Sequence, residues 1–261
     1  MQALYIASTG MAAQETNVNV ISNNIANMRT TGYKRQRAEF QDLLYQEYRR
    51  AGSTTSDSGT QLPVGIEVGS GVRISATTRD MSQGSIVASG KDLDMAVQGD
   101  GYFIVNLPNG TTGYTRDGSF ERDGSGQLTT VDGYQVQPGI TIPDNASNVA
   151  ISPDGIVTAV VGTDTAPTQL GQLQLARFVN KGGLESVGNN LFTETPSSGP
   201  AQVGVPNADG MGSIQQSYLE NSNVNAVTEI SDLIAAQRAY EMNARVVTGA
   251  DEMLQTTSQM K

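Results

Sequence analysis

The sequence predicts an α+β protein in which long N- and C-terminal helices pair as a coiled coil and an antiparallel β domain is inserted between them. Near both ends of the chain, apolar residues recur every three or four positions, which is the spacing of one helix face. Between the ends, short runs of β-branched residues alternate with glycine turns, as in antiparallel sheets. The chain has 261 residues, enough for one large domain or a few small ones.

The first helix is predicted over residues 3–28, followed by a stop at Gly32. Its other faces carry Ser, Thr, Asn and Gln in place of the usual Glu and Lys. Such a helix is marginal by itself, so we expect it to need partners on several sides. Its apolar seam steps by three and four residues through Leu4, Ala7, Met11, Gln14, Val18, Ile21, Ile25 and Met28.

A second helix is predicted over about 225–257, with Asn223 or Asn225 as its N-cap. Each helix has one apolar seam that it cannot bury alone, so we expect the two to pair and to bring the termini together. The alternative is that both pack separately on a globular core, which the polar but uncharged outer faces disfavour. The second seam runs through Ala226, Ile230, Leu233, Gln237, Tyr240, Ala244, Val247, Asp251 and Leu254.

The middle of the chain is predicted to be β-rich. Residues 51–62 have the composition of a flexible linker, and strands are expected from about residue 64 to residue 215. Asp-Gly pairs, which favour hairpin turns, recur at 100–101, 117–118, 123–124, 132–133, 154–155 and 209–210. Expected strands include 93–97, 102–105, 151–161, 173–179 and 191–193. The predicted domains are a helical one (1–30 and 221–261), a linker segment with a β hairpin (31–75) and a β-rich one (76–220).

Composition excludes several functions. The absence of Cys and His removes disulfides, thiolate chemistry and the commonest general base and metal ligand. The net charge of −10 argues against nucleic-acid binding, and residues 51–220 carry all of it because the flanking segments balance. The ends can therefore pack against copies of themselves at little electrostatic cost. No apolar run approaches the ~18–20 residues of a membrane span, and no cleaved signal is evident at the N-terminus.

Each local pattern that suggests catalysis has a simpler explanation. Asp57-Ser58-Gly59 resembles an aspartic protease signature but lies in a Ser/Thr-rich stretch. Asp92 and Asp94 are expected to share one solvated strand face, although paired carboxylates also perform acid-base chemistry. Asp123–Gly126 lacks the closing Glu of a calcium loop, and Gly99-Asp100-Gly101 lacks the third glycine of a dinucleotide site. Lys34–Arg37 is predicted to be a basic turn beside acidic neighbours. We therefore predict no catalytic residue, metal site or cofactor.

Three long motifs identify a family. Ser22–Asn27 running into Thr31–Arg35 resembles the N-terminal signature of bacterial flagellar rod and hook proteins. Tyr218–Asn225 and Ile234–Asn243 resemble the C-terminal signature, and Asp92–Phe103 is similar to the start of the β domain of this family. The similarity covers essentially the whole chain. Within the family it is greatest to the distal rod: residues 45–73 resemble the segment that separates distal rod from hook, including Tyr45, Tyr48, Leu62, Pro63, Gly65 and Val72.

The resemblance implies a structural subunit that self-assembles into a hollow helical drive shaft for flagellum-dependent motility. The terminal helices would form the inner tube, the segment over 31–75 a stiffening layer and the β domain the outer surface. It implies type III export and a rod that crosses the periplasm and outer membrane within the basal body. The implied partners are proximal rod proteins, hook protein, the peptidoglycan-layer and outer-membrane ring proteins, the rod cap and the export apparatus. The residues expected to carry self-assembly are Leu4, Met11, Val18, Ile21, Ile25, Ile230, Leu233, Gln237, Tyr240, Val247 and Leu254.

Other functions remain open at this point. The same family contains proximal rod and hook subunits, which share the terminal motifs. Two classes outside it are a cell-wall enzyme with a β domain, which needs a carboxylate pair in a cleft, and a monomeric adhesive module. An ordered monomer with fully helical ends would favour the adhesive module, whereas a gain of helix on polymerisation would favour the structural subunit.

Overall fold

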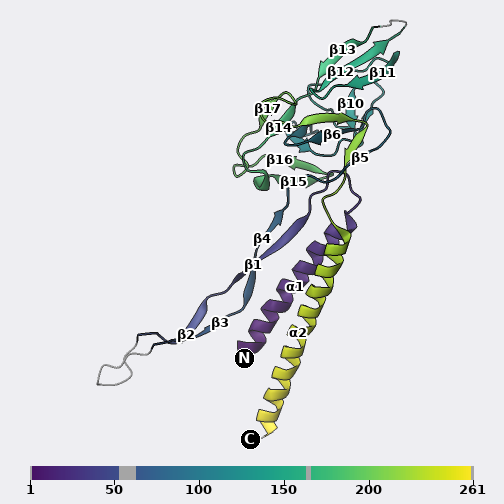
Figure 1. Cartoon of the computed structure of the whole chain (residues 1–261). Helices are drawn as coiled ribbons and strands as arrows, with labels where there is room; N and C mark the ends of the chain where they lie inside the picture. Colours follow the sequence, from purple (N-terminus) through teal and green to yellow (C-terminus); the bar gives the residue numbers. More distant parts are fainter. Residues whose placement is uncertain (1, 53–62, 163–165, 260–261) are drawn as a thin grey trace. The chain divides into compact units, whose positions relative to one another are not determined.

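The computed structural model describes residues 2–52, 63–162 and 166–259 and divides the chain into two compact units. The helical unit comprises Met1–Ile25, Gln36–Thr78 and Ala226–Lys261, and the β unit comprises Ala26–Arg35 and Arg79–Asn225. Each unit is therefore built from segments that are far apart in the sequence, as the colours of Figure 1 show. Most of the linker predicted over 51–62 lies outside the described residues.

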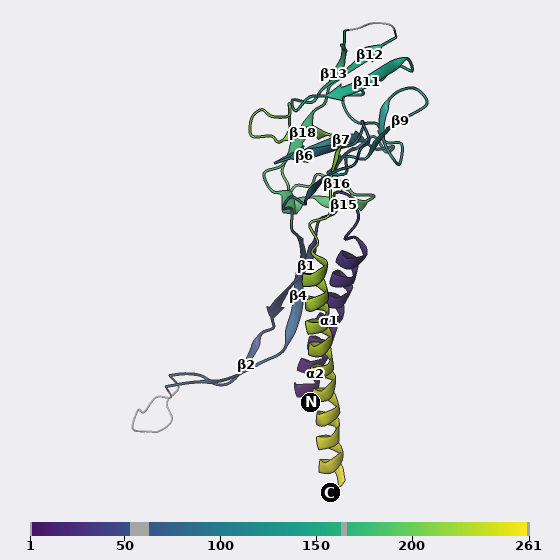
Figure 2. The ribbon, with the colours of Figure 1, turned by 45° about the vertical axis from the view of Figure 1, so that its right-hand side comes forward.

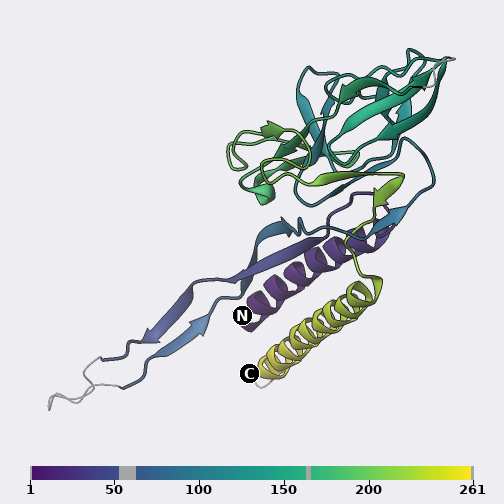
Figure 3. The ribbon, with the colours of Figure 1, turned by 45° about the horizontal axis from the view of Figure 1, so that its top comes forward.

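The two predicted helices are present, as α1 (Gln2–Ala26) and α2 (Ala226–Gln259). They lie side by side and antiparallel in the helical unit (Figures 1, 2 and 3). Gly10 lies against the side chain of Asn243, and Asn24, fourteen residues further along α1, bonds to Glu229, fourteen residues earlier on α2. These two contacts define the antiparallel register of the pair.

At the helix ends, one prediction is wrong and one of two alternatives holds. α1 ends at Ala26, six residues before Gly32, so the predicted stop at Gly32 is wrong; Gly32 instead belongs to the β unit and donates its N–H to the carbonyl of Glu220. Asn225 directly precedes α2 at the N-cap position. Asn223 is no part of that cap, because its side-chain oxygen accepts a hydrogen bond from the backbone N–H of Arg35.

A two-stranded ribbon completes the helical unit. β1 (Gln36–Asp42) pairs with β4 (Val72–Arg79), and β2 (Tyr45–Arg49) pairs antiparallel with β3 (Ile66–Gly69). The pair of β2 and β3 lies within 31–75, where a β hairpin was expected, whereas β4 continues to Arg79. Gly71 sets the ribbon against α1: its φ is +113°, and an added Cβ would collide with the Thr9 hydroxyl, which accepts a hydrogen bond from the Val72 N–H. Only glycine meets both conditions.

The β unit contains the remaining strands. A six-stranded antiparallel sheet has the order β15-β16-β8-β7-β14-β17, and a three-stranded sheet has the order β11-β12-β13. Three strand pairs, β10-β9, β18-β6 and β19-β5, surround them. A 3₁₀ turn, η1 (Lys181–Gly183), precedes β15. The strand bounds are β5 Ile86–Ala88, β6 Met95–Gln98, β7 Tyr102–Asn106, β8 Thr112–Thr115, β9 Phe120–Arg122, β10 Leu128–Thr130, β11 Ala146–Ile151, β12 Ile156–Val161, β13 Thr168–Gln172, β14 Leu175–Arg177, β15 Glu185–Gly188, β16 Leu191–Thr193, β17 Gln202–Gly204, β18 Ser213–Gln216 and β19 Tyr218–Glu220.

Strand β7 is buried on both faces, as its uninterrupted apolar run predicts. Phe103 and Val105 point into the larger core cluster, where the Phe103 ring lies 5.0 Å from that of Phe120. Tyr102 and Ile104 point into a second cluster on the opposite face. Side chains alternate along a strand, so one apolar strand joins the two cores.

Two of the Asp-Gly pairs close hairpins between consecutive paired strands, namely 123–124, between β9 and β10, and 154–155, between β11 and β12. A third, 132–133, closes a tight turn after β10, where Thr129 forms an antiparallel bridge with Gln135. The pair at 100–101 instead connects β6 to β7, which belong to different sheets, and the pair at 209–210 does the same for β17 and β18. The region expected to be β over 151–161 contains the end of β11 and the whole of β12, joined by the expected turn at 154–155.

The glycine at 118 gives a direct test of packing in the β unit. An added Cβ at Gly118 would overlap the backbone carbonyl of Met95, which cannot move without displacing strand β6. We expect Gly118→Ala to lower the free energy of unfolding by at least about 2 kcal/mol, as over-packed core sites do. Gly124→Ala is the matched control, because nothing lies within 4 Å of its added Cβ. Urea denaturation followed by circular dichroism measures both, and equal midpoints would contradict the prediction.

Candidate assembly surfaces and the polar clusters beside them

The residues predicted to carry self-assembly are distributed over both helices with very different exposure. Ile21 is buried, whereas Leu4, Met11, Val18, Ile25, Leu233 and Val247 are half-buried. Ile230, Gln237, Tyr240 and Leu254 are exposed. Further apolar residues of α2 that the predicted seam omits are also exposed, among them Val227, Ile234, Met242, Val246 and Met253. The periodicity identified one seam, but α2 presents apolar side chains on more than one face.

A groove of about 460 Å³ lies between the helices, lined by Glu15, Val18, Asn19, Gln237, Tyr240 and Glu241. Three of the predicted assembly residues, Val18, Gln237 and Tyr240, therefore lie at one place. Glu15 and Glu241 add a carboxylate from each helix. The helices do not close over each other here, so the groove is a surface of the helical unit that another chain could fill.

The segment expected to be specific to the distal rod forms the exposed hairpin of β2 and β3. Tyr45 and Tyr48 are exposed on β2, and the Tyr48 hydroxyl donates a hydrogen bond to the Gln2 side chain. Pro63 is exposed, Gly65 half-buried and Val72 half-buried at the start of β4, while Leu62 lies outside the described residues. Three other exposed apolar side chains of the hairpin were not predicted from the sequence, namely Leu44 (90% exposed), Val64 and Ile66. A single exposed apolar side chain is ordinary, but several on one hairpin are typical of an interaction surface.

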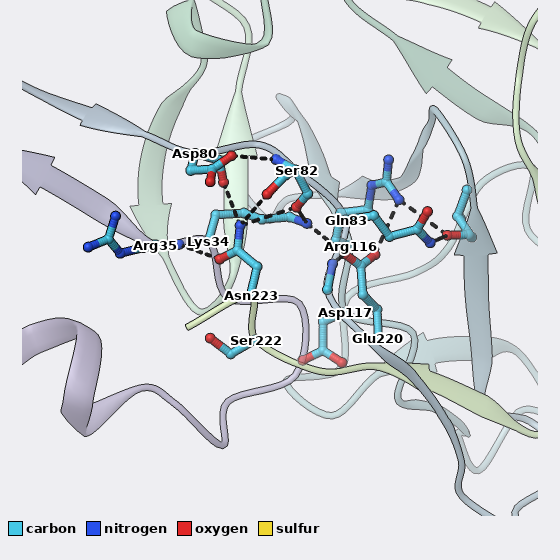
Figure 4. A network of polar contacts seen from close by, with 12 residues as sticks. Lys34, Arg35, Asp80, Ser82, Gln83, Arg116, Asp117, Glu220, Ser222 and Asn223 are labelled. Atoms are coloured by element: carbon cyan, nitrogen blue, oxygen red, sulfur yellow. Dashed lines mark hydrogen bonds and ion pairs between the residues drawn. The ribbon is translucent and has the colours of Figure 1, made fainter. Parts of the chain in front are cut away.

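A buried charged cluster, the Glu220 cluster, joins four segments of the β unit (Figure 4). One Glu220 oxygen lies 2.6 Å from Lys34 Nζ and the other lies 3.2 Å from a terminal nitrogen of Arg116. All three side chains are at most 3% exposed. Lys34 also donates to the carbonyl of Ser82. The Gly84 N–H donates to Glu220 as well.

Lys34 and Arg116 share the single carboxylate of Glu220, and backbone carbonyls accept their further hydrogen bonds. Arg116 donates to the backbone carbonyls of Val97 and Gly99, and its Nε is buried without a hydrogen-bond partner among the described residues. Burial is the largest influence on Lys34 and lowers the pKa of its ammonium group, which Glu220 opposes. Because the folded state then binds this proton less tightly than the unfolded chain, the shift disfavours folding at neutral pH and fades as the pH approaches 10.5.

The cluster is therefore costly to bury and costly to break, so its main effect is to specify which segments meet. Beside it, the Asn223 side chain donates to the carbonyls of Asp80 and Ser82, and the Asn190 amide donates to the carbonyl of Thr31. These contacts tie residues 31–35 and 220–223, which adjoin the segments of the two helices, into the β unit.

A second polar cluster, the Glu229 cluster, lies in the helical unit. The Asn24 amide nitrogen donates to Glu229 at 3.0 Å and to the carbonyl of Gln36 at 2.8 Å, and the Asn24 oxygen accepts from the Gln36 N–H at 2.9 Å. Asn24 is 1% exposed and Glu229 is fully buried. The cluster joins the end of α1, the start of β1 and the first turn of α2.

Neither cluster was predicted from the sequence. The only indication in the sequence was that several of their members lie within the motifs that carry the family resemblance, namely Asn24, Lys34, Glu220 and Asn223. The prediction that Lys34–Arg37 has acidic neighbours is confirmed, since Lys34 pairs with Glu220 and Arg37 with Glu39. The predicted turn is wrong, because this stretch runs directly into strand β1, which begins at Gln36.

The patterns weighed for catalysis form no site in the described parts of the chain. Asp92 and Asp94 lie in a turn before β6, and Asp94 is buried while Asp92 is exposed, so their predicted common strand face is wrong. Asp123 accepts hydrogen bonds from Ser125 and Gln127 within its own turn. Asp57-Ser58-Gly59 lies outside the described residues. Within residues 2–52, 63–162 and 166–259, no group of three or more acidic side chains is placed to bind a metal ion.

No helix among these residues is both long and apolar enough to span a membrane.

Three flagellar families match separate parts of the chain. Residues 4–34 match "Flagella basal body rod protein", residues 96–159 match "Flagellar hook protein FlgE/F/G D1 domain" and residues 215–260 match "Flagellar basal body rod FlgEFG protein C-terminal". The chain is 54% identical over 261 residues to the flagellar basal-body rod protein FlgG of Caulobacter vibrioides, covering 100% of both chains. It is 51% identical to that of Agrobacterium fabrum, over 99% of this chain and 98% of the relative, and 35% identical to that of Bacillus subtilis, over 100% and 99%.

The chain belongs to the flagellar basal-body rod family of structural proteins. Relatives that are 43–54% identical to it over the full length are named FlgG, so it is a structural subunit of the distal rod, located in the flagellar basal body, and not an enzyme. As a member of this family, it assembles with other rod and hook components.

Proposed function

We propose that copies of this chain assemble into a hollow helical shaft that transmits torque from the motor to the hook. The observation that carries the proposal is the amount of apolar surface that the helical unit leaves exposed. α2 presents Val227, Ile230, Ile234, Met242 and Met253 to solvent, and the hairpin presents Leu44, Tyr48 and Val64. Side chains of this kind gain free energy when neighbouring subunits cover them.

In the proposed shaft, α1 and α2 pair as a coiled coil and line the inner tube, formed by residues 1–30 and 221–261. The two helices lie side by side with three predicted assembly residues at the groove between them, which supports this arrangement. Neighbouring copies would cover the other predicted residues that the single chain leaves partly or fully exposed, namely Leu4, Met11, Ile25, Ile230, Leu233, Val247 and Leu254, while Ile21 is already buried within the helical unit. Helices with so many uncharged polar residues gain order as these contacts form.

The segment over 31–75 is proposed to stiffen the shaft, with the exposed hairpin of β2 and β3 packing on a neighbouring copy. Its exposed Tyr45 and Tyr48 supply large, rigid contact area. Residues 76–220 are proposed to form the outer surface, where nearly all of the excess negative charge of the chain lies.

The proposed partners, beyond further copies of the chain, follow from this place in the flagellum. They are the proximal rod proteins, the hook protein, the peptidoglycan-layer and outer-membrane ring proteins, the rod cap and the flagellar type III export apparatus. The rod would cross the periplasm and the outer membrane. The relatives of the FlgG type over the full length favour the distal rod over the proximal rod and the hook.

Removal of the first helix tests the proposal. We expect a chain that begins after Met28 to stay soluble and β-rich, because it keeps Lys34 and the whole of the β unit apart from its first residues. It should fail to polymerise, because α2 loses its partner helix. Sedimentation and electron microscopy measure polymerisation, and circular dichroism should show a gain of helix when the full chain assembles. Filaments formed by the truncated chain at the concentration that suffices for the full chain would contradict the proposal.

A further inference from the structure

Four charged side chains lie in the middle of the two helices. Glu15 is the only charged residue between Gln2 and Ala26 of α1, and Glu241, Arg238 and Arg245 lie on α2. Within residues 2–52, 63–162 and 166–259, none of the four forms an ion pair with the same chain. All four are exposed.

The two acidic side chains lie together. Glu15 from α1 and Glu241 from α2 both line the groove of about 460 Å³, which Val18 and the exposed Tyr240 also line. The groove therefore combines an apolar lining with two negative charges of the same sign, which favour a cation over a neutral occupant.

The two arginines lie on a different face of α2. Successive residues of an α-helix are rotated by about 100°, so Arg238 and Arg245 share one stripe, roughly a quarter turn from the groove-lining Gln237, Tyr240 and Glu241. Arg238 also belongs to a row at intervals of four residues, namely Ile234, Arg238, Met242 and Val246, and every member of this row is exposed. Such a row is the ridge that fits into the groove of another helix.

We propose that this ridge of one copy, with Arg245 beside it on the same face of α2, docks into the groove of the next copy, so that Arg238 and Arg245 face Glu15 and Glu241. The inference rests on the proposed function, because it names the contact that holds neighbouring copies together. Ridge and groove are complementary in apolar character and in charge. The apolar side chains of the ridge would meet Val18 and Tyr240, and the two arginines would meet the two carboxylates. Because ridge and groove are different surfaces of the same subunit, each docked copy offers a free groove or a free ridge to the next. A head-to-tail contact of this kind extends into an open helical polymer.

Charge reversal in the full-length protein tests this contact. The groove variant carries Glu15→Lys and Glu241→Lys, and the ridge variant carries Arg238→Glu and Arg245→Glu. In either variant ridge and groove have the same sign, so we expect the critical concentration for assembly to rise at least tenfold. Glu252→Lys is the matched control on the same helix, because its exposed carboxylate lies outside the groove, and it should assemble within about twofold of the unaltered chain.

Mixing the two variants gives the decisive measurement. In an equimolar mixture, the arginine ridge of the groove variant meets the glutamate groove of the ridge variant, and the glutamate ridge of the latter meets the lysine groove of the former. We expect the mixture to assemble near the critical concentration of the unaltered chain, as an alternating copolymer. If the substitutions impaired assembly by damaging the fold of each variant, mixing the two variants would not restore assembly.

The outcomes separate this inference from the proposed function. Failure of the unaltered chain to polymerise at any concentration would overturn the proposed function. If the unaltered chain polymerises and either variant alone polymerises equally well, the docking contact is overturned while the polymer stands. The contact is also overturned if both variants, with the circular dichroism of the unaltered monomer, fail in the mixture as they do separately.

Discussion

Glu220→Gln is expected to lower the free energy of unfolding of the β unit by about 3–5 kcal/mol, a large effect for a substitution that preserves side-chain shape. The variant leaves Lys34 and Arg116, both almost fully buried, without their shared anion. Two buried cations without a counter-charge cost more than the backbone carbonyls of Ser82, Val97 and Gly99 recover. Since domains are stable by only about 5–15 kcal/mol, the variant should be close to unfolding at ordinary temperature.

Two control variants test whether the loss of stability in Glu220→Gln arises from the buried charge. Glu185→Gln removes a carboxylate from the exposed strand β15 and should change the midpoint of urea unfolding little. Lys34→Met should cost less than Glu220→Gln, because Glu220 keeps Arg116 and one buried cation disappears. The measurement is urea unfolding followed by tyrosine fluorescence, to which Tyr102 and Tyr114 of the β unit core contribute among the nine tyrosines of the chain. A loss below about 1 kcal/mol for Glu220→Gln would show that the cluster is not the junction that holds the β unit together.

Asn24→Ala is expected to raise the critical concentration for assembly by about a hundredfold. The variant removes the donor to the buried Glu229 carboxylate and both hydrogen bonds to the Gln36 backbone. Loss of hydrogen bonds at a buried charge costs about 2–4 kcal/mol, and every 1.4 kcal/mol is a factor of ten in an equilibrium constant. The lost hydrogen bonds lie where α1, β1 and α2 meet. The helical unit is therefore destabilised and loses order, while the β unit remains folded.

Ser22→Ala is the matched control for this prediction, because Ser22 is exposed on the same helix. Its critical concentration should match that of the unaltered chain within about twofold. The unfolding transition of the β unit should be the same in all three proteins. An unchanged critical concentration for Asn24→Ala would mean that the Glu229 cluster has no part in ordering the helices for assembly.

The location of the helices could be predicted from sequence almost to the residue, because a 3.6-residue periodicity is a local property. The seams over 3–28 and 225–257 correspond to α1 over Gln2–Ala26 and α2 over Ala226–Gln259. The buried strand β7 and the hairpin turns at 123–124 and 154–155 were predictable for the same reason. The turns at 100–101 and 209–210 were not, since an Asp-Gly pair specifies a turn but not whether the strands beside it pair.

The Glu220 and Glu229 clusters could not be predicted from the sequence. Lys34 and Glu220 are 186 residues apart, and Asn24 and Glu229 are 205 residues apart. A Lys in a basic run and a Glu in a polar motif look like surface residues, because charged side chains are rarely buried unless paired. Which partner each one finds depends on where the whole chain brings its segments.

The sequence by itself determined the family, the extent of both helices and the absence of the residues most enzymes use, since motif, periodicity and composition are read along the chain. Only the tertiary structure decided which helix faces remain exposed and which charges are buried together. Those outcomes depend on competition among neighbours for the same surface. α1 packs on both α2 and the ribbon, and no local pattern states which of its faces each neighbour covers.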